Sequence, residues 1–228
     1  MYGYEDIAGR FFDCRYLLVV MSVEAPKISG LPDSSDLFNF VLGTGVLAAA
    51  FAAFYGQLEL SSVLFYVLAG GAVLATRELG VGIAANLLDG YASLEVSSPG
   101  STVTVFGAIL SVVTGLPIIL LFPVYSDVSR KKYEQWGRST DVVWAMYKFK
   151  IARLALSMLI IGFAVSTVLG FSELAQMYAL FAFFQALPFD YSSIPTGPLD
   201  GAEILRWSGF WWLFFTGVSI LMITFSVV

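Results

Sequence analysis

Apolar residues occur in long runs along the chain, separated by short polar stretches. The first strong run covers residues 37–55 and follows the polar stretch 33–36, whose Asp and Ser side chains are suited to cap a helix. The second covers residues 61–88. A transmembrane helix needs about 20 predominantly apolar residues, so both runs predict helices that cross a membrane.

Four further runs extend this pattern. Residues 106–124, 151–169 and 202–228 are each long enough to span, and residues 174–187 form a shorter run whose complete crossing stays open. Glycine and proline inside the first of these are tolerated in membrane helices when neighbours satisfy the freed carbonyl groups. The pattern therefore predicts about six transmembrane helices, the last opening with an interfacial belt of Trp207, Trp211 and Trp212.

The segments between the runs are short or polar. Two runs typical of strands, residues 94–96 and 102–105, flank a Ser-Ser-Pro-Gly turn and predict a short β-hairpin. The polar loop 127–150 holds half of the twelve basic residues, so the positive-inside rule places it in the cytoplasm. Residues 1–36 contain only a short apolar run among acids, and we expect an interfacial or extramembrane arm that precedes a transmembrane domain, residues 37–228.

Composition supports a membrane location. Hydrophobic residues make up 58% of the 228 residues and charged residues 13%, with a mean hydropathy of +0.81. Soluble domains carry about 25% charged residues. We therefore expect an all-α polytopic protein of the cell (plasma) membrane, with the lipid bilayer as its solvent. The net charge of −5, with the basic residues gathered in one loop, argues against nucleic acid as a partner.

The chain has no histidine and a single cysteine, Cys14. These counts exclude an internal disulfide, a cysteine-rich metal site, and nucleophilic catalysis by Ser-His or Cys-His pairs. No cofactor is expected.

Ionisable residues inside the apolar runs are the candidates for function, since each costs about 2.5–3.5 kcal/mol on insertion. Arg77 and Glu78 lie inside the second run. They would snorkel to the interface if a shorter helix ended there, but apolar sequence continues to residue 88, which favours burial. The second candidate is a broken segment leading into the last run, with Asp200 and the helix-breaking residues Pro195, Gly197, Pro198 and Gly201.

These two segments resemble the site-2 proteases, a family of intramembrane zinc metalloproteases. In that family one helix carries a His-Glu-x-x-His motif, and a later proline-rich loop supplies an aspartate as third zinc ligand. Here the corresponding segments are Arg77-Glu78-Leu79-Gly80-Val81 and the loop that ends in Asp200-Gly201. The resemblance covers about residues 60–212 and is closest to archaeal-type members with an extra hydrophobic segment between the motifs.

The departures from the family pattern decide what the resemblance implies. Arg77 and Val81 occupy both histidine positions, while Glu78 matches the general base and Asp200 the third ligand. Carboxylates alone do not suit a catalytic zinc. The resemblance therefore implies a zinc-less, non-catalytic core that binds a transmembrane segment of a partner protein or serves as a subunit of a membrane complex. We expect Arg77 to replace the metal by pairing with Asp200, Glu78 or both.

Two other functions stay open. An active intramembrane protease, metallo- or aspartyl-type, would need a non-standard site, for example Asp89 and Asp200, which both lie in Leu-Asp-Gly triplets and could share a proton. A small-solute or ion transporter or channel would also have buried charges and a broken helix. Transporters usually contain internal repeats, and the sequence has none.

Two local contacts are also predicted. Gly70, Gly71, Gly80 and Gly82 are small enough to let helices approach closely in a membrane. Glu203 and Arg206 are spaced to pair on one face of a helix.

Overall fold

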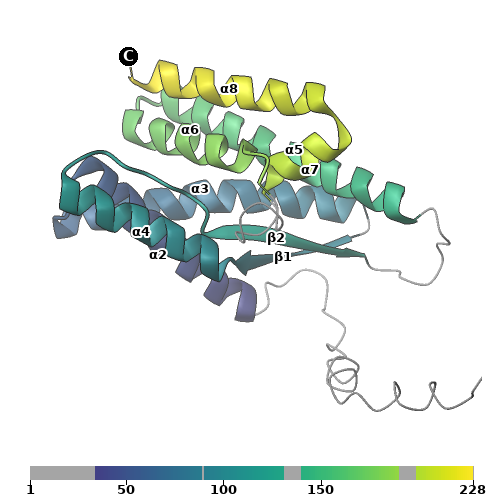
Figure 1. Cartoon of the computed structure of the whole chain (residues 1–228), viewed down its shortest axis with the longest axis horizontal. Helices are drawn as coiled ribbons and strands as arrows, with labels where there is room; N and C mark the ends of the chain where they lie inside the picture. The colour runs from purple at the N-terminus through teal and green to yellow at the C-terminus, as the bar shows by residue number, and fades with distance from the viewer. Residues whose placement is uncertain (1–33, 89, 131–139, 190–198, 228) are drawn as a thin grey trace, which may run out of the picture. The chain divides into compact units, whose positions relative to one another are not determined.

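The computed structural model describes residues 34–88, 90–130, 140–189 and 199–227 (Figure 1). The described residues are mostly helical and contain one small sheet. The order of elements is α2 (Ser34–Tyr55), α3 (Leu60–Leu87), β1 (Gly90–Val96), α4 (Ser98–Thr114), β2 (Val124–Arg130), α5 (Thr140–Val168), α6 (Ser172–Ala186), α7 (Asp200–Trp207) and α8 (Gly209–Val227).

Helices long and apolar enough to cross a membrane number four within the described residues: Ser35–Tyr55, Leu60–Leu87, Met146–Val168 and Gly209–Ser226. Their outward faces carry large apolar side chains, such as Leu68 at 76% exposure. An apolar surface of this kind suits lipid rather than water. The membrane prediction agrees with these helices, but the described part of the chain contains fewer candidate spans than the six predicted.

The predicted span 106–124 and the predicted hairpin 94–105 are both wrong. A helix, α4, begins at Ser98, where the Ser97 hydroxyl accepts the Gly100 N–H at 3.0 Å and a proline occupies the first turn. It ends at Gly115, whose φ of 68° is the left-handed conformation that commonly stops helices. Its 17 residues extend only about 26 Å, so α4 is too short for a candidate span.

The sheet joins segments on either side of α4. Strand β1 pairs antiparallel with β2, with Leu94 opposite Ser126 and Val96 opposite Val124. The segment predicted to be one polar loop, 127–150, therefore begins inside a strand and ends inside α5. Residues 131–139 lie outside the described residues.

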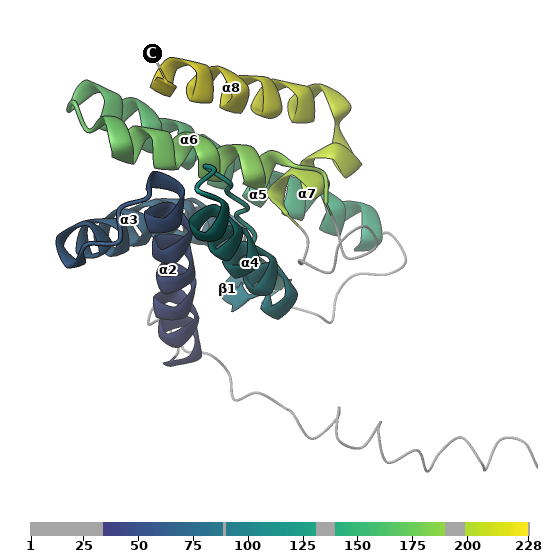
Figure 2. The ribbon, with the colours of Figure 1, turned by 60° about the vertical axis from the view of Figure 1, so that its left-hand side comes forward.

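Helix α6 is a core helix. It has 15 residues, and Met177, Ala179 and Phe181 are fully buried. It packs against α5 on one side and α8 on another (Figure 2). The run 174–187 is therefore apolar because other helices enclose it, and it is too short to be one of the candidate spans.

The last predicted span, 202–228, is two helices. Helix α7 ends at Trp207, Ser208 adopts extended backbone (φ −156°, ψ 112°), and α8 begins at Gly209. The short α7 turns its acidic residues inward, whereas α8 alone meets the length of a span.

Close helix contacts depend on particular glycines. An added Cβ at Gly80 would lie 3.0 Å from the Leu154 carbonyl oxygen on α5, and one at Gly70 would lie 3.5 Å from Leu47 Cβ on α2. Gly71 likewise faces Thr44. Gly82 has nothing within 4 Å, so the prediction of close packing there is wrong.

Candidate functional site

Arg77 lies in the middle of the uninterrupted helix α3 and is fully buried, with 0% exposure. It is the largest fully buried side chain among the described residues. A guanidinium cannot lose its charge in a protein, so its position requires acceptors from neighbouring elements. The alternative that Arg77 snorkels to the interface does not describe this structure.

Asp200 provides two of these acceptors. Arg77 Nε donates to Oδ2 at 3.0 Å and Nη2 donates to Oδ1 at 2.9 Å. This is the planar, two-bond geometry in which arginine recognises a carboxylate. Asp200 is the first residue of α7, and it is 7% exposed. The pair therefore fixes the start of α7 against the middle of α3.

Glu78 and Ser126 contact the third guanidinium nitrogen, Nη1. Arg77 Nη1 donates to the Ser126 hydroxyl at 2.7 Å and also forms an ion pair with Glu78 Oε1. The Ser126 hydroxyl in turn donates to Glu78 Oε1 at 3.2 Å. We call Arg77, Glu78, Ser126 and Asp200 the arginine cluster. It connects α3, β2 and α7.

Burial acts on the charges of the arginine cluster. The pKa of the Asp200 carboxyl group is raised by burial, and the adjacent Arg77 guanidinium opposes that rise by favouring the ionised form. The two buried charges are thus matched, and a change that removes one leaves the other uncompensated.

The residues of this site do not fit a catalytic zinc ion. A guanidinium stands at the first histidine position that the resemblance defines, and Val81 at the second is 1% exposed. Val81 packs in an apolar cluster with Ala84, Ile151 and Ala155. Within the described ranges, no group of three or more His, Cys, Asp or Glu residues is arranged to hold a metal ion.

Gly201 determines how α7 meets α6. A Cβ at this position would lie 2.0 Å from the Ala186 carbonyl oxygen, which only a glycine avoids. The Leu199 N–H donates to the Phe189 carbonyl at 3.1 Å. The other predicted residues of the broken segment, Pro195, Gly197 and Pro198, lie outside the described residues, as does Asp89.

A second polar group lies one turn along α7. Glu203, 8% exposed, accepts from Arg206 at 3.3 Å, as its spacing predicts, and also from Lys148 of α5 at 3.5 Å. This group connects α7 to α5.

Sequence reasoning missed Ser126. The hydroxyl comes from a strand whose partner is 32 positions away, Leu94. No local sequence pattern indicates that pairing. Ser126 comes just after the apolar run 106–124, and a serine at that place is compatible with a strand.

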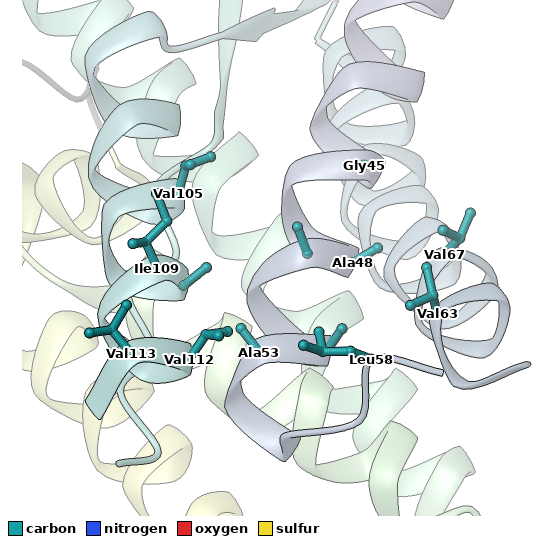
Figure 3. Close-up of a pocket in the computed structure, with 13 residues that line it drawn as sticks. Gly45, Ala48, Ala53, Leu58, Val63, Val67, Val105, Ile109, Val112 and Val113 are labelled. Carbon is teal, nitrogen blue, oxygen red and sulfur yellow. The ribbon is translucent and has the colours of Figure 1, made fainter. Parts of the chain in front are cut away.

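A second missed feature is an apolar groove of about 480 Å³ between α2, α3 and α4. Figure 3 shows Val105 and Ile109 of α4 on one side, Val63 and Val67 of α3 on the other, and α2 between them. Small residues of α2 line it at four-residue spacing: Gly45, Ala49 and Ala53. This spacing was visible in the sequence, and it is the pattern by which membrane helices approach closely.

Comparisons of the chain with protein-family models, with curated proteins and with solved structures found no match.

Proposed function

We propose that this chain is a zinc-less membrane protein with a site-2-protease-like core, which binds a transmembrane segment of a partner protein and does not cleave it. The observation that carries the proposal is the two-bond contact between Arg77 and Asp200. Under the resemblance, these residues stand at two zinc-ligand positions. A guanidinium supplies the positive charge there without supplying a Lewis acid or an activated water.

The remaining acids of the site are poorly suited to catalysis. Glu78, at the position of the general base, already accepts from Arg77 and Ser126. Because these contacts engage the carboxylate, it is not arranged to take a proton from an attacking water. Asp200 is held on both oxygens by Arg77, so it is not arranged to share a proton with a second aspartate. These contacts disfavour the protease alternatives.

The groove supports binding of a helix. Two of its walls, α2 and α3, are candidate spans, so the groove would open toward hydrocarbon. Membrane helices associate through close backbone approach over small residues, and the exposed Gly45 and Ala49 provide such a surface. A transmembrane segment of another protein, or of another subunit in a complex, is the occupant we propose.

Photo-crosslinking in native membranes tests this binding. A photoreactive residue at Ala49 or Ile109, on two walls of the groove, should give discrete protein adducts whose cross-linked peptide comes from an apolar transmembrane segment. The matched controls are Leu68 and Phe225, which are 76% and 75% exposed and do not line the groove. Lipid adducts alone at all four positions, or the same protein adduct at all four, would contradict the proposal.

A filling variant adds a second test. Gly45→Leu should abolish the adduct formed from Ile109, because the leucine occupies the groove. Gly82→Leu, at a glycine with nothing within 4 Å, should leave that adduct unchanged. An unchanged adduct in the Gly45→Leu variant would locate the partner elsewhere.

Metal analysis tests the zinc-less core. The purified protein should contain no stoichiometric zinc, and chelators should not change its thermal stability. One tightly bound zinc per chain, together with a proteolytic activity lost on chelation, would overturn the proposal. Restoring both family histidines with Arg77→His and Val81→His should create zinc binding if the core resembles the family. Failure of the double variant to bind zinc while it remains folded would count against the family resemblance.

A further inference from the structure

Basic and aromatic side chains gather where α5, α7 and α8 meet. We propose that they bind the headgroup of an anionic phospholipid. We call this surface the basic–aromatic patch, and it consists of Lys150 and Arg153 on α5, Arg206 and Trp207 on α7, and Trp211 on α8. None of these residues belongs to the arginine cluster or the groove, so the inference is independent of the proposed function.

Contacts across the three helices define the patch. The Arg153 guanidinium lies 5.3 Å from the centre of the Trp211 ring and 5.7 Å from that of Phe149. The Phe149 ring stacks on Trp207 at 6.0 Å. Lys150 precedes Arg153 by three positions on α5, which places the two side chains on neighbouring parts of one face. Both are exposed.

The depth of the Arg153 guanidinium matches a membrane interface. The candidate span of α5 starts at Met146, so the Arg153 backbone lies about 10 Å inside it. The side chain folds back one turn over Phe149 and reaches Trp211, two residues after the α8 span starts at Gly209. Arginine snorkels in this direction to keep its charge near the headgroups.

The patch carries three positive charges, and their contacts within the described residues differ. Arg206 pairs with Glu203, which also accepts from Lys148. Among the described residues, Arg153 has ring contacts and no ion pair. These rings offer no hydrogen-bond acceptor to the Arg153 N–H groups, which can therefore donate to phosphate oxygens.

A lipid phosphate is the anion that this location favours. Tryptophan side chains are enriched at headgroup depth, and the patch lies around the start of two candidate spans. Each basic residue near an anionic membrane surface increases the affinity for that surface by about fivefold. The cytoplasmic orientation expected for residues 127–150 would place the patch in the inner leaflet.

Native mass spectrometry of the full-length protein tests the proposal. The protein is exchanged into neutral detergent and mixed with equal amounts of phosphatidylglycerol and phosphatidylcholine. We expect retention of phosphatidylglycerol over phosphatidylcholine. Lys150→Gln with Arg153→Gln should weaken that preference by about 25-fold, since two charges are removed. Lys150→Arg with Arg153→Lys keeps both positive charges and should retain most of that preference.

Two further experiments distinguish a lipid phosphate from free phosphate as the bound anion and control for misfolding of the double variant. Inorganic phosphate in excess should not displace the lipid, because it lacks the acyl chains that hold the headgroup at the interface. If the double variant does not fold, Arg206→Gln alone, at a side chain 53% exposed, should lower retention by about fivefold. Equal retention of both lipids, displacement by inorganic phosphate, or unchanged retention in the patch variants would each overturn the proposal.

Discussion

The guanidinium of Arg77 and the carboxylate of Asp200, 123 positions apart in the sequence, form two parallel hydrogen bonds of 3.0 and 2.9 Å inside the protein. Arg77 belongs to a candidate membrane span and Asp200 to the first turn of a short helix outside the candidate spans. The pair thus ties the start of α7 to the middle of α3.

Removing Arg77 should strongly destabilise the protein. Arg77→Ala leaves Asp200 and Glu78 without their cation, which we expect to lower the free energy of unfolding by about 3–5 kcal/mol. Denaturant titration of the purified protein in detergent measures this loss. Arg206→Ala, at an exposed arginine, is the control and should cost at most about 1 kcal/mol.

Coupling between the two residues is a separate prediction. Arg77→Ala with Asp200→Ala should lose less stability than the sum of the two single variants, because the double variant leaves neither charge of the pair uncompensated. Additive losses would show that the pair does not act as a unit. Arg77→Lys should recover only part of the loss, since an ammonium group cannot form the two-bond geometry.

The Ser126 hydroxyl should contribute measurably to the same cluster. Ser126→Ala removes an acceptor for Arg77 and a donor for Glu78, at an expected cost of about 1.5–3 kcal/mol for hydrogen bonds to charged groups. Ser157→Ala is the matched control, because that hydroxyl donates only to the Arg153 carbonyl in its own helix. Equal stabilities of the two variants would remove Ser126 from the cluster.

Two glycines of one helix should respond oppositely to the same substitution. Gly80→Leu places a side chain against the α5 backbone, where Leu154 O and Ala155 Cα would lie 3.0 and 3.1 Å from its Cβ. We expect a loss of about 1–3 kcal/mol from overpacking. Gly82→Leu points into open space and should be neutral or stabilising, since leucine favours a helix over glycine. Thermal unfolding of both variants in the same detergent measures this difference in stability.

The orientation of the chain can be tested with cysteine labelling. We place single cysteines at Ser129 and Ser139 in a Cys14→Ser background and add an impermeant thiol reagent to intact cells. Because the positive-inside rule places residues 127–150 in the cytoplasm, both positions should be labelled only after the membrane is permeabilised. Rapid labelling of both in intact cells would show the opposite orientation.

Several elements could be predicted from the sequence because their signals are local. The runs 37–55 and 61–88 match α2 and α3 closely, since length and apolar composition suffice to identify such helices. The pair of Arg77 with Asp200 could be anticipated because a guanidinium within an apolar run needs an acceptor. The resemblance to the site-2 proteases suggested Asp200, Glu78 or both as that acceptor.

Other elements were predicted wrongly because an apolar sequence does not indicate whether lipid or protein surrounds the segment. Residues 174–187 are as apolar as a lipid-facing helix, but α6 is enclosed by protein. Residues 106–124 form one apolar run, but helix α4 begins at Ser98, after the Ser97 cap, and ends at Thr114, before the left-handed Gly115.

The sequence by itself determined that this chain requires a membrane and that its buried arginine requires a carboxylate, because both follow from the cost of exposing apolar surface to water and of burying an unpaired charge. The tertiary structure decided the rest of the site. Strand β1 pairs with β2 although the whole of α4 separates them in the sequence. That pairing brings the Ser126 hydroxyl to Arg77 and Glu78. The paired residues are 28 to 40 positions apart, a separation that no local sequence pattern spans, so only the packed chain specifies which hydroxyl completes the cluster.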